Sequence, residues 1–203
     1  MLGATFHAMG DQPRALDSYQ RAQSIAPSAG TYVNIGSLHY VKGEYANAAE
    51  SYRRAIELKP LEPNFHFNLA DAEERLGSGK AAASYKRAAE LLNDLLAVKP
   101  NDAQARSLLA MCQMNLGDLD AALANAEQAV ARARNDPEVL YRRAAVYTSR
   151  GRTKDALAAL AEAFDAGYSV SSAQTADSLE PLRNNPDFKS VLETARKKQS
   201  RND

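Results

Sequence analysis

The stretch TYVNIGSLHYVKGEYANAAESYRRAIELKP, residues 31–60, decides the fold of this 203-residue chain. It holds two helical patterns that are separated by Gly43, and it ends at Pro60. A glycine just past a helix readily adopts the left-handed conformation, whereas proline clashes with the preceding turn and lacks an amide donor. The stretch therefore predicts a helix, a corner at Gly43 and a second helix that stops before Pro60.

The same arrangement recurs along the chain. Corner glycines follow one another at intervals of 33, 34, 40 and 34 residues: Gly10, Gly43, Gly77, Gly117 and Gly151. Behind each glycine comes a small-large-small face with spacing four then three: Ala15-Tyr19-Ala22, Ala48-Tyr52-Ala55, Ala81-Tyr85-Ala88, Ala122-Ala126-Ala129 and Ala156-Leu160-Ala163. Small side chains let helices approach closely, and the large one fills the adjacent hole. A period of about 20 to 50 residues indicates stacked units, so we expect an all-α solenoid of about five helix-turn-helix repeats.

Composition favours protein partners. The chain has 25 Lys plus Arg and 25 Asp plus Glu, so no overall field draws it to nucleic acid or to an anionic membrane. Cys112 is the single cysteine and cannot form an internal disulfide, and no Asn-x-Ser/Thr acceptor is present. No run approaches the roughly 20 apolar residues that span a bilayer. We therefore expect a cytoplasmic protein that does not enter a membrane.

The residues resemble the tetratricopeptide repeat family. The second repeat carries most of the family signature, in 32–36, 43–45, Ala48, Tyr52, Ala55 and Pro60. His39 departs from it, because the family usually has tyrosine there, whereas Tyr147 of the fifth repeat keeps that tyrosine. The resemblance covers Met1 to about Gly167. It implies a right-handed superhelix that binds a protein or peptide partner in its concave groove.

The predicted array occupies residues 1–167, and residues 168–203 form a C-terminal capping segment with a basic tail. The five repeats are expected at about 1–28 (partial), 29–62, 63–102, 103–136 and 137–167. Counting back from Gly10, the first repeat would begin before Met1, which predicts an excised fragment; the alternative is a short native end with a frayed helix. Leu2, Phe6 and Met9 then present an uncapped apolar face, and we expect self-association through it.

The third repeat is six residues longer than its neighbours. Leu91, Leu92, Leu95 and Leu96 continue an apolar stripe at helical spacing, so its second helix is expected from about Lys80 to Val98. At about 1.5 Å per residue, the added turns displace the next repeat by roughly 10 Å along the helix axis. The sequence therefore predicts an offset between the third and fourth repeats.

The repeat pattern stops after Gly167. Asn185 suits an N-cap, Pro186 a first-turn position, and the apolar stripe that begins at Phe188 predicts a capping helix. This segment resembles the ends of tetratricopeptide arrays in bacterial signalling proteins. In that resemblance the upstream part is often a serine/threonine kinase or a nucleotide cyclase.

No catalytic, cofactor or metal site is expected. His7, His39 and His66 lack metal-ligand spacing. The run 77–80, Gly-Ser-Gly-Lys, lacks the upstream glycine and the strand of a phosphate loop. Cys112 has no histidine at a persuasive spacing, so we interpret it as structural.

The resemblance places candidate groove residues on the first helices of the repeats. They are Asn34, Ser37, Tyr40, Phe67, Asn68, Asp71, Arg75, Met111, Met114, Tyr141 and Arg142. Asn34 and Asn68 are equivalent, and their amides could pair with a peptide backbone, while Phe67 and the methionines accept apolar side chains. The alternative is that each asparagine hydrogen-bonds within its own repeat.

A carboxylate clamp for chaperone tails is disfavoured. Tetratricopeptide domains that hold such a tail resemble one another in using lysine and asparagine from one repeat, asparagine from the next, and lysine and arginine from the third. The corresponding positions of repeats two to four are Val33, Ser37, Asn68, Gln104 and Leu108, and only Asn68 has the expected residue type. The sequence predicts a non-catalytic protein-protein interaction module that binds an extended peptide or a partner protein. The alternatives are an oligomerisation scaffold, or the regulatory domain of a larger signalling protein of the kinase or cyclase type.

Overall fold

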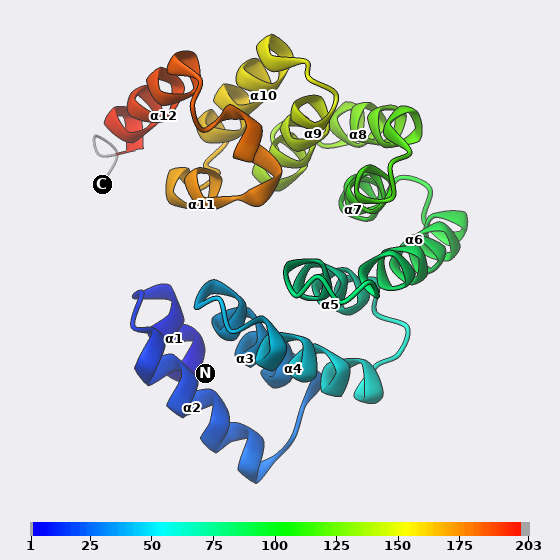
Figure 1. Ribbon diagram of the computed structural model, residues 1–203, viewed down its shortest axis with the longest axis vertical. Helices are drawn as coiled ribbons and strands as arrows, with labels where there is room; N and C mark the ends of the chain where they lie inside the picture. The colour runs from blue at the N-terminus through cyan, green and yellow to red at the C-terminus, as the bar shows by residue number, and fades with distance from the viewer. Residues whose placement is uncertain (1, 200–203) are drawn as a thin grey trace. The chain divides into compact units, whose positions relative to one another are not determined.

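The computed structural model describes residues 2–199, without the side chains of His7 and Ala8. This part of the chain is made of α-helices and one 3-10 helix, and it contains no strand (Figure 1). The chain divides into two compact units, Met1–Leu91 and Leu92–Asp203, which we call the N-terminal and C-terminal units. The all-α solenoid fold is confirmed, while the offset between repeats three and four stays a prediction. Arg201 of the predicted basic tail lies outside the described residues.

The N-terminal unit consists of consecutive antiparallel helices. They are α1 (Leu2–Ala8), α2 (Gln12–Ile25), α3 (Ala29–Val41), α4 (Tyr45–Leu58), α5 (Pro63–Arg75) and the first part of α6 (Ala81–Val98). Helix α1 packs on α2, and α4 packs on both α3 and α5. The helical hairpin of α3 and α4 is the stretch that predicted the fold.

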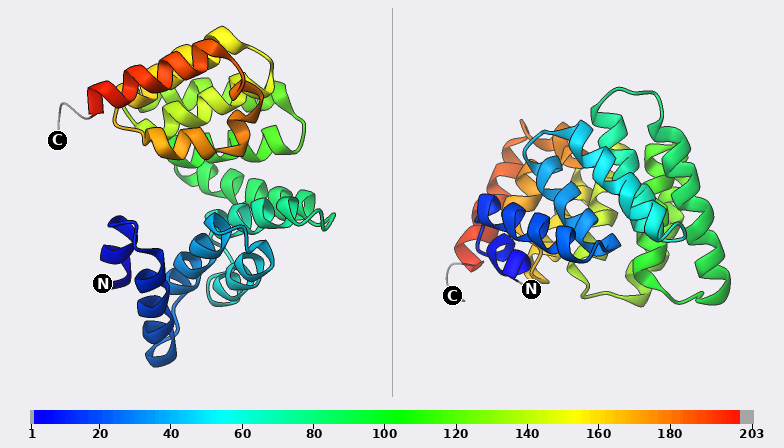
Figure 2. Two further views of the ribbon diagram at one scale, coloured as in Figure 1. Left: turned by 60° about the vertical axis from the view of Figure 1, so that its left-hand side comes forward. Right: turned by 90° about the horizontal axis from the view of Figure 1, so that it is seen from below.

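The C-terminal unit continues the pattern and then closes it. Its helices after α6 are α7 (Ala103–Asn115), α8 (Leu119–Arg132), α9 (Pro137–Ser149), α10 (Thr153–Asp165), α11 (Val170–Thr175), η1 (Asp177–Leu182) and α12 (Pro186–Gln199). Helix α12 lies beside α10, and η1 packs on α9 (Figure 2).

The five corner glycines all adopt positive φ, from 61° to 85°. At each corner the amide that follows the glycine donates to a carbonyl five residues earlier, as from Glu44 N to His39 O at 2.9 Å. This bond satisfies a carbonyl that the helix end would otherwise leave without a partner. The predicted corners are confirmed. Pro63 and Pro137 are the first residues of α5 and α9, a position where the helix needs no amide donor.

The small-large-small faces form the core, except that Ala81 is only partly buried and Ala22 is exposed. The alanines and tyrosines of repeat two are buried, and the Tyr52 ring lies against Gly36. Ala22 was expected in the same role, but it is exposed. The periodicity fixes which face of α2 Ala22 occupies, whereas burial also needs neighbouring helices to cover that face, and Ala22 lines an open cleft among α1, α2 and α3.

The long helix of repeat three and the capping helix are confirmed. Helix α6 runs from Ala81 to Val98 and has 18 residues, about one turn more than the 14 residues of α4. Asn185 Oδ1 accepts from the amides of Asp187 and Phe188 at 2.8 and 3.4 Å, as an N-cap does. Helices α11 and η1, which precede this cap, were not predicted.

The N-terminal apolar face is smaller than predicted. Leu2 and Met9 are exposed, but Phe6 is half-buried against the core residues of α2 and α3. Arg14 also lies over the Phe6 ring, with its guanidinium carbon 4.6 Å from the ring centroid. Helix α1 ends at Ala8, so the three residues do not share one helical face.

Candidate protein-interaction surface

Asn34 and Asn68 are predicted groove residues whose side-chain amides have no hydrogen-bond partner in the described part of the chain. They occupy equivalent positions on α3 and α5, nine residues before Gly43 and Gly77, and both are half-buried. Within residues 2–199, neither amide makes a hydrogen bond. The alternative, a hydrogen bond within the repeat, is therefore not formed in this structure. A side-chain amide offers two donors and an acceptor, which matches the donors and acceptors of an extended peptide backbone.

The other candidates on α3 contact neighbouring helices. The Ser37 hydroxyl donates to Val33 O at 3.0 Å and lies 3.3 Å from the Tyr52 hydroxyl. Burial raises the pKa of Tyr52 to about 12, and the hydrogen bond with Ser37 opposes that shift. Tyr40 packs edge-on against Tyr45, with ring centroids 5.3 Å apart. Ser37 and Tyr40 therefore hold α3 to α4. The Tyr40 side chain remains half-exposed.

On α5, three candidates are tied to their surroundings. Arg75 donates to the Tyr45 hydroxyl at 2.8 Å and lies over its ring. The Phe67 ring packs edge-on against Tyr85, with centroids 5.6 Å apart. Asp71 accepts from the Tyr85 hydroxyl at 2.6 Å. Phe67 is still half-exposed, so it offers apolar surface one residue from Asn68.

The Tyr85 hydroxyl lies between two carboxylates. It is 2.6 Å from Asp71 Oδ1 and 2.9 Å from Glu74 Oε2, although a phenol carries one proton. Burial, and after it the two carboxylates, raise the pKa of Tyr85 well above its ordinary value. The hydroxyl therefore stays protonated, and its hydrogen bonds hold the N-terminal part of α6 against α5.

The methionine candidates lie on α7 in the C-terminal unit. Met111 is only 7% exposed, so its side chain offers little surface to a partner. Met114 is half-buried and packs against the alanine cluster of α7 and α8. The sequence pattern marks the helix face of Met111, but it does not show how far neighbouring helices cover that face. The expectation that Met111 accepts a partner's apolar side chain is corrected on that ground.

Tyr141 is covered by the protein's own C-terminal segment. Its ring stacks on Tyr168 with centroids 4.3 Å apart and planes 7° from parallel, and its hydroxyl lies 2.8 Å from Ser178 Oγ of η1. Leu179 and Leu182 of the same segment are fully buried in the core of this unit. Tyr141 is therefore half-buried against this segment.

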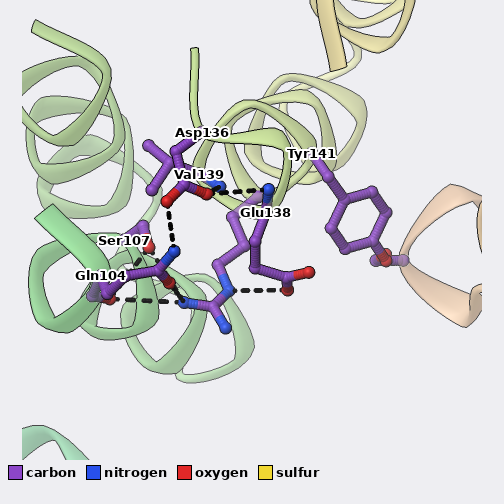
Figure 3. A network of polar contacts seen from close by, with 8 residues as sticks. Gln104, Ser107, Asp136, Glu138, Val139 and Tyr141 are labelled. Carbon is purple, nitrogen blue, oxygen red and sulfur yellow. Dashed lines mark hydrogen bonds and ion pairs between the residues drawn. The ribbon is translucent and has the colours of Figure 1, made fainter. Parts of the chain in front are cut away.

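Arg142 is held in a network that joins α9 to α7 (Figure 3). Its Nε donates to Glu138 at 3.1 Å, and Nη1 donates to Ser107 Oγ at 3.0 Å and to Gln104 at 3.3 Å. Gln104 in turn donates to Asp136, whose other oxygen caps α9. The Arg142 side chain is 16% exposed. Its main role in this structure is to fix α9 against α7, while Tyr141 points away from the network.

Sequence reasoning missed a buried carboxylate. Glu73 is 3% exposed and accepts from Arg53 Nη2 of α4 at 2.9 Å and from Ser84 Oγ of α6 at 2.7 Å. The three residues tie α4, α5 and α6 together. The pattern gave no signal, because Glu73 stands in a run of charged residues and its partners lie 20 and 11 positions away.

Repeat models match much of the chain. A TPR repeat model matches residues 36–77, and two tetratricopeptide repeat models match residues 80–124 and 113–169. The chain belongs to the tetratricopeptide repeat family. Proteins of this family generally mediate protein-protein interactions. Among described residues, none of the helices has the length and hydropathy that crossing a membrane requires.

Similar proteins have varied roles. Photosystem I assembly protein Ycf3 from Rippkaea orientalis is 29% identical over 112 residues, which cover 49% of this chain and 65% of Ycf3. Protein O-mannosyl-transferase TMTC1 from Homo sapiens is 24% identical over 139 residues, which cover 68% of this chain and 15% of TMTC1. The chain thus spans less than two thirds of these relatives.

Solved structures share the fold. TTC0263, a thermophilic tetratricopeptide repeat protein from Thermus thermophilus, superposes with a TM-score of 0.63 at 22% identity, covering 96% of this chain and 95% of that chain. A chain of the APC/C hetero-tetramer Cut9-Hcn1 superposes with a TM-score of 0.58 at 19% identity, covering 95% of this chain and 35% of that chain. At these identities the likeness concerns the fold alone.

Proposed function

We propose that this tetratricopeptide repeat protein is a non-catalytic interaction module that binds an extended segment of a partner protein along α3 and α5. The observation that carries the proposal is the pair of unbonded, half-buried amides, Asn34 and Asn68, at equivalent positions of two successive repeats. A repeated amide suits a peptide, because each unit of peptide backbone presents the same donor and acceptor.

The surroundings of the two amides support this assignment. Tyr40 and Phe67 stay half-exposed while other rings fix their positions, so they offer apolar area at little cost in side-chain entropy. The candidates in the C-terminal unit are less available, since Met111 is buried and Tyr141 already contacts Tyr168 and Ser178. The proposal therefore confines the peptide site to the second and third repeats.

Peptides selected from a phage-displayed random library on the immobilised chain provide the probe. Their affinities are measured by calorimetry for the wild type, Asn34→Ala, Asn68→Ala and the double variant. A hydrogen bond contributes about 1 kcal/mol, so we expect roughly 5-fold weaker binding for each substitution and roughly 25-fold for both.

Asn64→Ala is the matched control, because Asn64 is an exposed asparagine in the first turn of α5. We expect it to bind the selected peptides as the wild type does. Unchanged affinity in the double variant, or an equal loss in Asn64→Ala, would contradict the proposed site.

A further inference from the structure

Helix α5 carries a pair of carboxylates beside the proposed peptide site. Asp71 lies one turn after Asn68, and Glu74 lies one turn further along the same side of the helix. Asp71 is half-buried and Glu74 is exposed. The equivalent positions, six and three residues before the corner glycine, are uncharged in repeats two, four and five: Ser37 and Tyr40, Met111 and Met114, and Ala145 and Thr148. Among these four repeats, only the third has an acidic pair.

The fold does not need two carboxylates at this place. The buried Tyr85 hydroxyl contacts both of them, but it has a single proton to give. Asp71 Oδ1, at 2.6 Å, is the nearer acceptor. In repeat two the equivalent Tyr52 hydroxyl lies 3.3 Å from Ser37 Oγ, so a neutral partner suffices for the same contact between helices. The second carboxylate, Glu74, is therefore not required for packing.

The surface around the two carboxylates has an excess of negative charge. Within the described part of the chain, no base pairs with Glu74. Arg75 follows it and donates to the Tyr45 hydroxyl of α4 at 2.8 Å, over whose ring it lies. Glu73 adds no charge to this count, because it is buried and pairs with Arg53. Two acids and one base therefore leave one negative charge beside the unbonded amide.

We propose that the partner segment carries a lysine or an arginine, whose cation binds between Asp71 and Glu74 while Asn68 holds the peptide backbone. The inference rests on the proposed peptide site and adds the chemistry of one side chain to it. Both carboxylates contact the same hydroxyl, so one ammonium or guanidinium group can reach both. Asn68 and Asp71 are about 4.5 Å apart along the helix axis, a step that the long stem of lysine or arginine spans.

A second selection from the phage-displayed random library, on Glu74→Gln in parallel with the wild type, tests the inference. Glutamine keeps the size of glutamate and can donate to the Tyr85 hydroxyl oxygen, so the variant is expected to melt as the wild type does. Lysine or arginine should be enriched at one position of the peptides selected on the wild type, and not in those selected on the variant.

The most enriched wild-type peptide is then compared by calorimetry with a copy that has glutamine in place of the base. Glu74→Gln should weaken binding of the basic peptide roughly 5-fold and leave binding of the neutral copy unchanged. Glu62→Gln is the matched control, because Glu62 is an exposed acid at the other end of α5 and makes no capping hydrogen bond. It should bind both peptides as the wild type does.

Three results would each overturn the inference: selected peptides without an enriched base, an equal loss for the basic and neutral peptides in Glu74→Gln, or an equal loss in Glu62→Gln. If such peptides still lose affinity through Asn34→Ala and Asn68→Ala, the peptide site stands without the basic side chain. A library that yields no binding peptide would overturn both proposals.

Discussion

The close contact between Gly36 and Tyr52 predicts a strong sensitivity to one methyl group. A Cβ on Gly36 would lie 2.6 Å from Tyr52 Cε1 and 2.9 Å from Cδ1. The ring is buried and packs against residues of α4 and α5, so it has no open space into which to move. Overpacking of this kind costs about 1–3 kcal/mol, and the gain in helix propensity offsets about 1 kcal/mol of it. Gly36→Ala is therefore expected to lose up to about 2 kcal/mol of unfolding free energy.

Gly30→Ala is the matched control, because it makes the same change in the same helix where nothing lies within 4 Å of the new methyl group. We expect it to be as stable as the wild type, or more stable by up to about 1 kcal/mol. Urea unfolding followed by circular dichroism measures both variants. A Gly36→Ala variant at least as stable as Gly30→Ala would refute the packing argument.

The fifth repeat suggests a second substitution that should restore the stability of Gly36→Ala. The residues equivalent to Gly36 and Tyr52 there are Ala144 and Leu160, both fully buried. In a Tyr52→Leu background the added methyl of Gly36→Ala has room. The double-mutant cycle should therefore show a favourable coupling of about 1 kcal/mol or more.

Three further predictions concern single residues. Arg53→Ala should lose about 1–3 kcal/mol because it removes a partner of the buried Glu73, whereas Arg54→Ala, which breaks only exposed ion pairs, should lose at most about 0.5 kcal/mol in urea unfolding. Gly43→Ala should lose about 1–2 kcal/mol in the same assay, since alanine at φ 77° is strained. Stability should fall between about pH 10 and 12, because the unfolded-state tyrosine ionises near pH 10 while the pKa of Tyr52 is raised to about 12. Tyr52→Phe should lose less stability over this pH range than the wild type. An equal loss in both proteins would contradict the assignment to Tyr52.

Helix order and corners could be predicted from the sequence because they depend on local chemistry. Gly43 and Pro60 act on their own turns of the chain, and the five glycines repeat the same hydrogen bond. The long helix α6 followed from a leucine stripe at helical spacing. The short helices α11 and η1 could not be predicted in this way, because neither has enough turns to show a period.

The exposure and hydrogen bonding of each candidate side chain depend on residues far away in the sequence. The repeat pattern alone could therefore not predict them. The Tyr141 hydroxyl contacts Ser178, 37 positions later, and Ala22 is exposed because it lines a cleft among α1, α2 and α3. The sequence could single out Asn34 and Asn68 because the same residue type recurs at the same position of two successive repeats. The absence of hydrogen bonds to their amides in the described part of the chain required the structure.

The side-chain amide resonances of Asn34 and Asn68 provide the most direct test of the proposed interaction surface. In an isotope-labelled sample titrated with a library-selected peptide, we expect both resonances to shift and their protons to exchange more slowly with solvent, while those of Asn64 do not change. Shifts confined to residues of α9 and η1, with the amides of Asn34 and Asn68 unchanged, would contradict the account.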